Sequence, residues 1–217
     1  MRVAPLLAGL ALGLVAFLPA RLLLPAPPLA ASAVSGSLRR AELADAQAGG
    51  IGLGTLSVAL QPQALLKGRL QWQLGGALSG TLWRSATAQG ADGLSGRLAG
   101  SALPGLPIRS LDLTGLSLAL DAAGRCQSAS GQVTASLATP IAGQASLSGS
   151  PTCDGDALSL PLASADGRLR LDLGIRPGRW QAITRISGAG PAELVALTAA
   201  GFRPDGPGLG LTQEGSW

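Results

Sequence analysis

The chain has 217 residues, of which 47% are hydrophobic, 13% are charged and only 3% are aromatic, and its formal net charge is +4. Lys67 is the only lysine, and no basic run exceeds Arg39-Arg40, which excludes the clustered footprint of a nucleic-acid-binding protein. The sequence contains no histidine, which excludes a Ser-His-Asp triad and removes the most common metal ligand. We therefore expect no enzyme, no cofactor and no metal site.

An apolar segment opens the chain. Residues 3–20 carry no charge, and Arg21 follows them. Because about 20 apolar residues span a bilayer, residues 1–24 are predicted to form one transmembrane helix, and Arg2 favours a cytoplasmic N-terminus. The alternative is a cleaved signal peptide that ends near Ala31-Ser32-Ala33. Either interpretation exports the remainder of the chain.

A proline-rich spacer, residues 25–33, is predicted to lead into one β domain at residues 34–217. Near the start of the domain stands Ser35-Gly36-Ser37-Leu38, a phrase that recurs as Ser79-Gly80-Thr81-Leu82. Ser-Gly then returns several times along the chain. Repetition of this kind is typical of stacked, similar strands.

Short segments of alternating apolar and polar residues follow one another, most clearly at residues 168–175. Strands are predicted at residues 34–38, 42–48, 51–60, 67–74, 77–86, 94–98, 108–120, 132–137, 144–147, 157–162, 168–175, 179–186 and 209–212. A single helical turn is expected at residues 62–66, and the phase slips at Gly115, which predicts a β-bulge. Close spacing and glycine-rich turns indicate an all-β fold, a curved antiparallel sheet of repeated short strands.

One short C-terminal helix is expected at residues 190–201. Pro191 stands in its first turn, Glu193 suits its positive N-terminal end, and Gly201 suits its C-cap. Leu194 and Leu197 are predicted to lie against the sheet. An open sheet of this kind exposes its edges, so a partner, a lid or a ligand is expected along its apolar face.

The two cysteines, Cys126 and Cys153, both follow the anchor. An even pair in an oxidising compartment predicts one disulfide, and two free thiols are the alternative. We expect no zinc site here, because two cysteines without histidine supply too few ligands.

Other polar motifs favour structural interpretations. Asp154-Gly155-Asp156 lacks the ligand pattern of an EF-hand and predicts a hairpin turn, with calcium binding as the alternative. Glu42 and Asp45 are expected at solvated positions, and the glycine-rich residues 49–54 lack the Lys-Ser/Thr of a phosphate loop. Packing on the sheet face, with contact to a partner or lipid as the alternative, is predicted for the tryptophans Trp72, Trp83 and Trp180.

Taken together, the apolar segment, the phrase at residues 34–38, and the strand, proline turn, Leu-Leu and Gly-Arg-Leu stretch of residues 51–70 resemble the type II secretion system protein N family. The helix and Asp-Gly turn within residues 191–208 also fit. The chain departs from the family pattern at Arg39 and Val58, where members often carry tryptophan.

The resemblance implies a non-enzymatic accessory component of the type II secretion system. It implies a single-pass bacterial inner-membrane protein with its bulk in the periplasm, and other inner-membrane secretion components as partners. The family is also similar to AsmA-like bridge proteins, whose curved sheets offer an apolar groove to lipid. A periplasmic lipid-binding or lipid-transfer protein is therefore the alternative function.

Overall fold

The computed structural model describes residues 29–30, 32–37, 40–48, 51–99, 108–141 and 143–216. The predicted anchor, residues 1–24, lies outside the described residues. Among the helices that the described part of the chain contains, none has the length and apolar character needed to span a bilayer.

The described residues form sixteen strands and two helices. Their bounds are β1 (Leu29–Ala30), β2 (Ala33–Ser37), β3 (Arg40–Ala48), β4 (Ile51–Leu60), α2 (Pro62–Leu65), β5 (Leu70–Gly76), β6 (Leu78–Arg84), β7 (Ala88–Ala99), β8 (Ile108–Asp121), β9 (Cys126–Ile141), β10 (Gln144–Gly149), β11 (Thr152–Asp154), β12 (Ala157–Ala163), β13 (Leu169–Arg176), β14 (Arg179–Ser187), α3 (Pro191–Ala199), β15 (Arg203–Asp205) and β16 (Gly208–Ser216).

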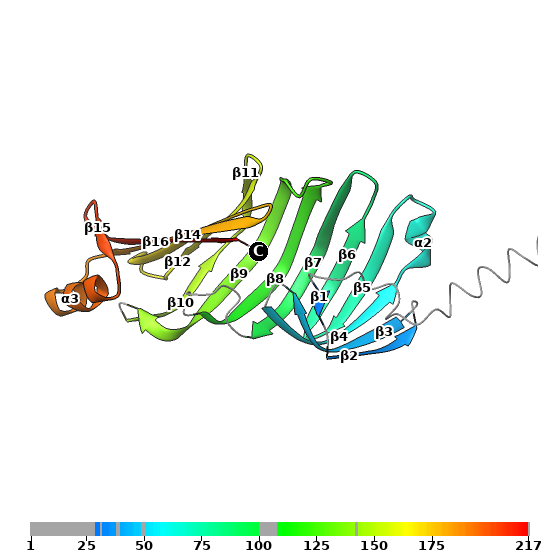
Figure 1. Cartoon of the computed structure of the whole chain (residues 1–217), viewed down its shortest axis with the longest axis horizontal. Helices are drawn as coiled ribbons and strands as arrows, with labels where there is room; N and C mark the ends of the chain where they lie inside the picture. The colour runs from blue at the N-terminus through cyan, green and yellow to red at the C-terminus, as the bar shows by residue number, and fades with distance from the viewer. Residues whose placement is uncertain are drawn as a thin grey trace, which may run out of the picture.

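All described strands belong to one antiparallel sheet, in which most strands pair with their neighbours along the chain (Figure 1). The order runs β1-β3-β4-β5-β6-β7-β8-β9-β10-β12-β13-β14-β16-β15, and β2 and β11 add short pairings to β3 and β12. The predicted all-β, antiparallel fold is confirmed. The order begins and ends with strands of two and three residues, β1 and β15, and short edge strands limit uncontrolled pairing with other chains.

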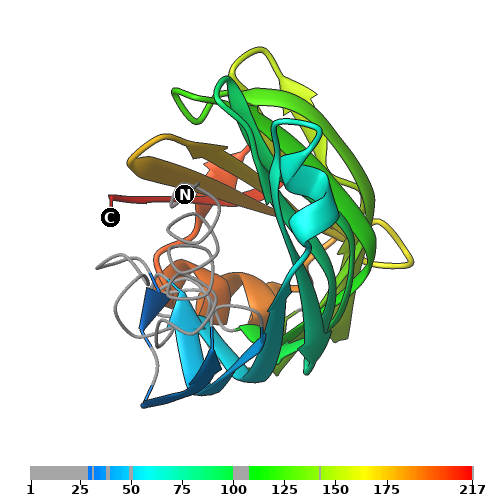
Figure 2. The same cartoon turned by 90° about the vertical axis from the view of Figure 1, so that its right-hand side faces the viewer.

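The sheet is strongly curved, and the long central strands bend around the axis of the molecule (Figure 2). Glycines of the repeated Ser-Gly phrase lie at register shifts between neighbouring strands. Gly80, Gly96 and Gly131 all have positive φ, at +140°, +149° and +114°. A Cβ on Gly131 would lie 2.6 Å from the Cα atom of Leu116 on the neighbouring strand. Only glycine fits such positions, so the repeated phrase supplies the places where the sheet bends.

Serine hydroxyls satisfy backbone groups along the same line. The N–H of Gly115 donates to Ser95 Oγ at 2.9 Å, and the N–H of Gly93 donates to Ser117 Oγ at 3.0 Å. The β8–β9 register shifts between Thr114 and Ser117, as the phase slip at Gly115 predicts. We call this line of irregularities across β6–β9 the bulge line. Because bulges bend strands, it accounts for much of the curvature.

Strand alternation divides the two faces of the sheet. In β13, Leu169, Leu171 and Leu173 are buried while Arg170 is exposed, and β14 places Ile186 directly opposite Leu169. The buried face is apolar because neighbouring strands place their leucine side chains against one another on it, and we call it the inner face of the sheet. The outer face is mostly polar.

The buried side chains form two clusters. The N-terminal cluster consists of Leu43, Ala46, Leu56, Leu74, Leu78, Ala91, Leu94 and Leu98. The C-terminal cluster consists of Ile108, Val133, Ala135, Leu137, Leu147, Leu162, Leu169, Leu171, Leu173, Trp180, Ala182, Ile186, Phe202 and Leu209. Leu111, Leu113 and Leu116 of β8 pack against both clusters, so one apolar core runs along the sheet.

Several elements differ from the sequence-based expectation. β9 extends from Cys126 to Ile141, far beyond the predicted residues 132–137, because polar serines and glutamines there occupy the exposed face of a long strand. β11 and β15 were too short to give a pattern. Leu29 and Ala30 of the predicted spacer pair with Ala48 and Gln47 of β3.

The predicted C-terminal helix is present as α3. Its first turn contains Pro191, and Glu193 Oε2 accepts a hydrogen bond from the N–H of Gly190 at 3.0 Å. Leu197 packs against the C-terminal cluster as expected, but Leu194 is 40% exposed, so this part of the prediction is wrong. Only one leucine therefore attaches the helix directly, and Phe202, just after it, is buried.

Candidate interaction surfaces

The predicted disulfide between Cys126 and Cys153 is formed, with a Cα–Cα distance of 5.5 Å and a sequence separation of 27. It joins the beginning of β9 to β11, and the N–H of Cys126 also donates to the carbonyl of Asp156 at 2.9 Å. The bond therefore fastens the short β11–β12 hairpin to the long central strand.

Asp154-Gly155-Asp156 forms the predicted hairpin turn between β11 and β12. Gly155 has a φ of +61°, and both aspartates are exposed. Asp156 lies 3.6 Å from the Arg176 guanidinium. Of the two carboxylates that would bind calcium in the alternative interpretation, Asp156 thus forms a surface ion pair with Arg176.

The acidic pair on β3 is also solvated. Glu42 is exposed, and Asp45 has a φ of 47° at an irregularity between β3 and β4, where its carboxylate accepts a hydrogen bond from Ser32 Oγ at 3.1 Å. Of the glycine-rich residues 49–54, the first two lie outside the described residues and the others belong to β4.

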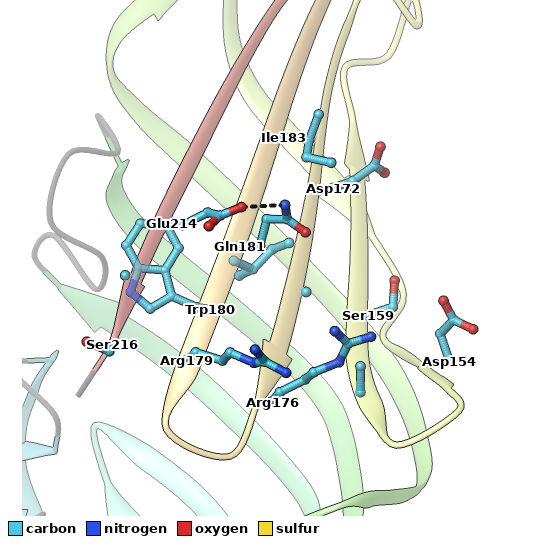
Figure 3. A pocket seen from close by; sticks show the side chains of 14 residues that line it. Asp154, Ser159, Asp172, Arg176, Arg179, Trp180, Gln181, Ile183, Glu214 and Ser216 are labelled. Atoms are coloured by element: carbon cyan, nitrogen blue, oxygen red, sulfur yellow. Dashed lines mark hydrogen bonds between the residues drawn. The ribbon is translucent and has the colours of Figure 1, made fainter.

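A shallow depression of about 650 Å³ lies across β12, β13, β14 and β16 (Figure 3). Its lining combines carboxylates with guanidinium groups, among them Asp172, Glu214, Arg176 and Arg179. Gln181 donates to Glu214 Oε1 at 2.8 Å. Opposite charges and amides alternate here without a nucleophile paired to a base, so the depression suits polar contact better than chemistry.

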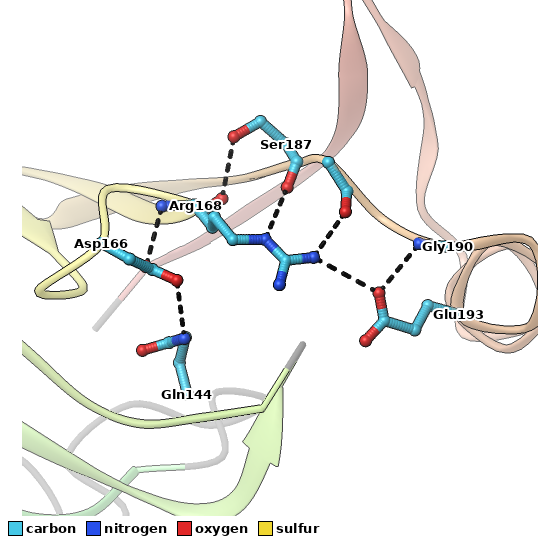
Figure 4. Close-up of polar contacts among 7 residues, drawn as sticks. Gln144, Asp166, Arg168, Ser187, Gly190 and Glu193 are labelled. Atoms are coloured by element: carbon cyan, nitrogen blue, oxygen red, sulfur yellow. Dashed lines mark hydrogen bonds and ion pairs between the residues drawn. The ribbon is translucent and has the colours of Figure 1, made fainter.

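A polar network joins α3 to the sheet (Figure 4). Arg168 donates to the carbonyls of Ser187 and Gly188 and lies 3.6 Å from Glu193. Asp166 accepts from Ser164 Oγ at 2.6 Å, from the N–H of Arg168 at 3.1 Å, and from Gln144 at 2.9 Å. The Ser164 hydroxyl, followed by the Arg168 N–H, lowers the pKa of Asp166. This network fixes where the helix begins.

Trp72, Trp83 and Trp180 lie on sheet faces, as predicted. Trp83 and Trp180 each stand directly opposite a glycine of the next strand, Gly90 and Gly215, whose Cβ positions the indole rings already fill. The Arg69 guanidinium lies 4.9 Å from the centre of the Trp83 ring. Trp72 pairs with Leu60 and Leu82.

Among the described residues up to the end of β8, the most exposed large apolar side chains lie at the β4–β5 connection. We call Leu65, Leu66, Lys67, Arg69 and Leu70 the α2 tip. Leu66 is 91% exposed, and Leu65 and Leu70 are 48% and 41% exposed. The tip is nevertheless well formed, because the N–H groups of Lys67 and Arg69 both donate to the carbonyl of Ala64, at 3.0 and 3.1 Å.

Sequence reasoning predicted the single turn at residues 62–66 but did not single out its leucines as a surface. One feature of the sequence could have indicated an exposed surface. Leu65 and Leu66 stand outside any apolar–polar alternation and are followed directly by Lys67, Gly68 and Arg69. The strand predicted at residues 67–74 begins at Leu70 in the structure. Residues 67–69 belong to the turn before it, because the N–H of Arg69 donates to the carbonyl of Ala64.

The described fold is thus an open antiparallel sheet with a packed inner face, a polar outer face and a protruding apolar tip. A family model described as type II secretion system (T2SS), protein N matches residues 27–210. The chain belongs to this family, and as a member it is a component of the type II secretion system of the bacterial envelope.

No curated protein and no solved structure matches the chain.

Proposed function

We propose that the chain is an accessory, non-enzymatic component of the type II secretion system that supports export of folded periplasmic proteins through contacts with other inner-membrane components. The observation that carries the proposal is the family match over residues 27–210, which coincides with the sheet from β1 to the first residues of β16. In this proposal residues 1–24 anchor the chain in the inner membrane and the sheet lies in the periplasm.

Two structural features support the periplasmic position and the scaffolding role. The Cys126–Cys153 disulfide suits an oxidising compartment. The polar depression and the rest of the outer face offer mixed charges of the kind found at the rims of protein interfaces.

The apolar inner face bears on the alternative of lipid binding. Leu43 and Leu56 are each 3% exposed, and Leu169 is 1% exposed. These side chains are already shielded from water, so no bound lipid is required to explain their burial. Lipid transfer is therefore an outcome to test and not a second proposal.

The proposal is tested by deleting the gene and measuring folded substrate proteins in the culture medium and in the periplasm. We expect substrates to accumulate in the periplasm, and a plasmid copy to restore their release. Affinity purification of the tagged full chain is expected to recover identified secretion components. Unchanged secretion with no recovered component would contradict the proposal, and native mass spectrometry showing a bound phospholipid would favour the lipid alternative.

A further inference from the structure

The α2 tip combines exposed leucines with positive charge on a rigid support. Leu65 and Leu66 project from a turn whose Ala64 is buried, and Lys67 and Arg69 follow directly. The described residues 51–84 contain no acidic side chain, so the cations at the tip have no carboxylate close in sequence.

Strand pairing brings a further cation to the same place. Arg84 at the end of β6 lies directly opposite Leu70 at the beginning of β5, and it is exposed. Arg69 is held over the Trp83 ring at 4.9 Å. Lys67, Arg69 and Arg84 therefore adjoin the exposed leucines in sequence or across the β5–β6 pairing, and the Trp83 indole contacts one of these cations.

This chemistry identifies the occupant. Leucine and lysine are poorly represented at the energetic centres of protein interfaces, where tryptophan, tyrosine and arginine anchors fill pockets. Protruding leucines flanked by lysine and arginine are instead typical of segments that lie in the headgroup region of an anionic bilayer. We propose that the α2 tip is a peripheral contact for an anionic phospholipid surface, with Leu65 and Leu66 entering the interface and the cations binding headgroups.

A second exposed apolar site among the described residues provides a matched control. On α3, Leu194 is 40% exposed and Val195 is 73% exposed, but the helix contains Glu193 and no basic residue. Apolar exposure is therefore comparable at the two sites, but the Arg168 guanidinium beside α3 faces Glu193 at 3.6 Å, whereas the cations of the tip have no carboxylate close in sequence. An anionic surface should distinguish them.

The test uses the full chain reconstituted in vesicles. Both native cysteines are bonded to each other, so Gln63→Cys or Ala192→Cys introduces a single free thiol for an environment-sensitive fluorophore. We expect the probe at position 63 to shift to shorter emission wavelengths, and to be quenched by nitroxide lipids, in vesicles that contain phosphatidylglycerol but not in pure phosphatidylcholine. The probe at position 192 should respond in neither.

Three variants separate the contribution of charge from that of apolar contact. The double variant Lys67→Gln, Arg69→Gln is expected to lower the ratio of inserted to free tip by about 30-fold, because each cation contributes about 1 kcal/mol of attraction to an anionic surface. Leu65→Ser with Leu66→Ser should abolish the quenching, and the exposed positions of both leucines leave the fold intact, as circular dichroism will check. Lys67→Gln alone keeps the Arg69–Trp83 contact and should have an intermediate effect.

The proposal is overturned if the probe at position 63 remains in water in anionic vesicles. It is also overturned if that probe changes its environment only after other secretion components are added, since the tip is then a protein-docking surface. The inference does not depend on the secretion role, because the vesicle measurement contains this chain alone.

Discussion

The C-terminal half of the sheet, β9–β16, and the N-terminal half, β1–β8, share one ladder of hydrogen bonds but are stabilised unequally. The disulfide, the Asp166–Arg168–Glu193 network and the largest fully buried side chains, Leu147, Leu169 and Ile186, all belong to the C-terminal half. The N-terminal half has a smaller buried cluster and carries the exposed α2 tip. The comparison indicates that one half holds the fold while the other presents a surface.

The sharpest contrast is between a core leucine and a tip leucine. Leu169 is 1% exposed and Leu66 is 91% exposed. We expect Leu169→Ala to lower the free energy of unfolding by about 3–4 kcal/mol because it leaves a cavity, and Leu66→Ala to change it by less than about 0.5 kcal/mol. Urea unfolding of the full chain in mild detergent measures both, and equal losses would contradict the assignment of Leu169 to the core and of Leu66 to the exposed tip.

Removing the disulfide should weaken the C-terminal half almost as much. Replacing Cys126 and Cys153 together by serine is expected to cost about 3 kcal/mol, because the bond restricts a loop of 27 residues in the unfolded chain. The same unfolding experiment, run on the wild type with and without reductant, provides the control. A loss under about 1 kcal/mol would show that β11 contributes little to the stability of this half.

The bulge line joins the two halves, and its glycines can be tested individually. A methyl group at Gly131 meets the backbone of Leu116, whereas one at Gly93, φ +63°, meets nothing within 4 Å. We expect Gly131→Ala to cost about 2–3 kcal/mol and Gly93→Ala about 1 kcal/mol, the cost of positive φ alone. Similar losses in thermal unfolding at the two positions would show that close strand approach is not what requires glycine.

The smallest effect concerns pH. Asp166 has a lowered pKa in the folded chain because the Ser164 hydroxyl and the Arg168 N–H stabilise its carboxylate. Its contribution to stability is therefore complete above the ordinary aspartate pKa of about 4 and is lost as the pH falls through the lower folded value. Asp166→Asn should make unfolding less sensitive to acid below about pH 4, and an unchanged acid profile would exclude this carboxylate as a contributor.

Much of the sheet could be predicted because alternation and glycine turns are local signals. Leu169, Leu171 and Leu173 reveal β13, and the slip at Gly115 reveals the bulge. The disulfide followed from the presence of only two cysteines. These features require no knowledge of distant contacts.

Other features depend on tertiary context. The exposed serines of β9 conceal the length of that strand, and the exposure of Leu194 depends on how α3 approaches the sheet. The α2 tip was missed because Leu65 and Leu66 resemble core residues until the fold shows that nothing described covers them. Burial of a leucine outside a periodic element cannot be deduced from composition.

Hydrogen exchange of the full chain in detergent tests the division of the sheet most directly. Amides of β13 and β14, which lie between paired neighbours beside the disulfide-linked hairpin, are predicted to exchange most slowly, and those of α2 most rapidly, with the N-terminal strands between them. Protection at α2 equal to that of β14, or slower exchange in β3–β5 than in β13 and β14, would contradict the account.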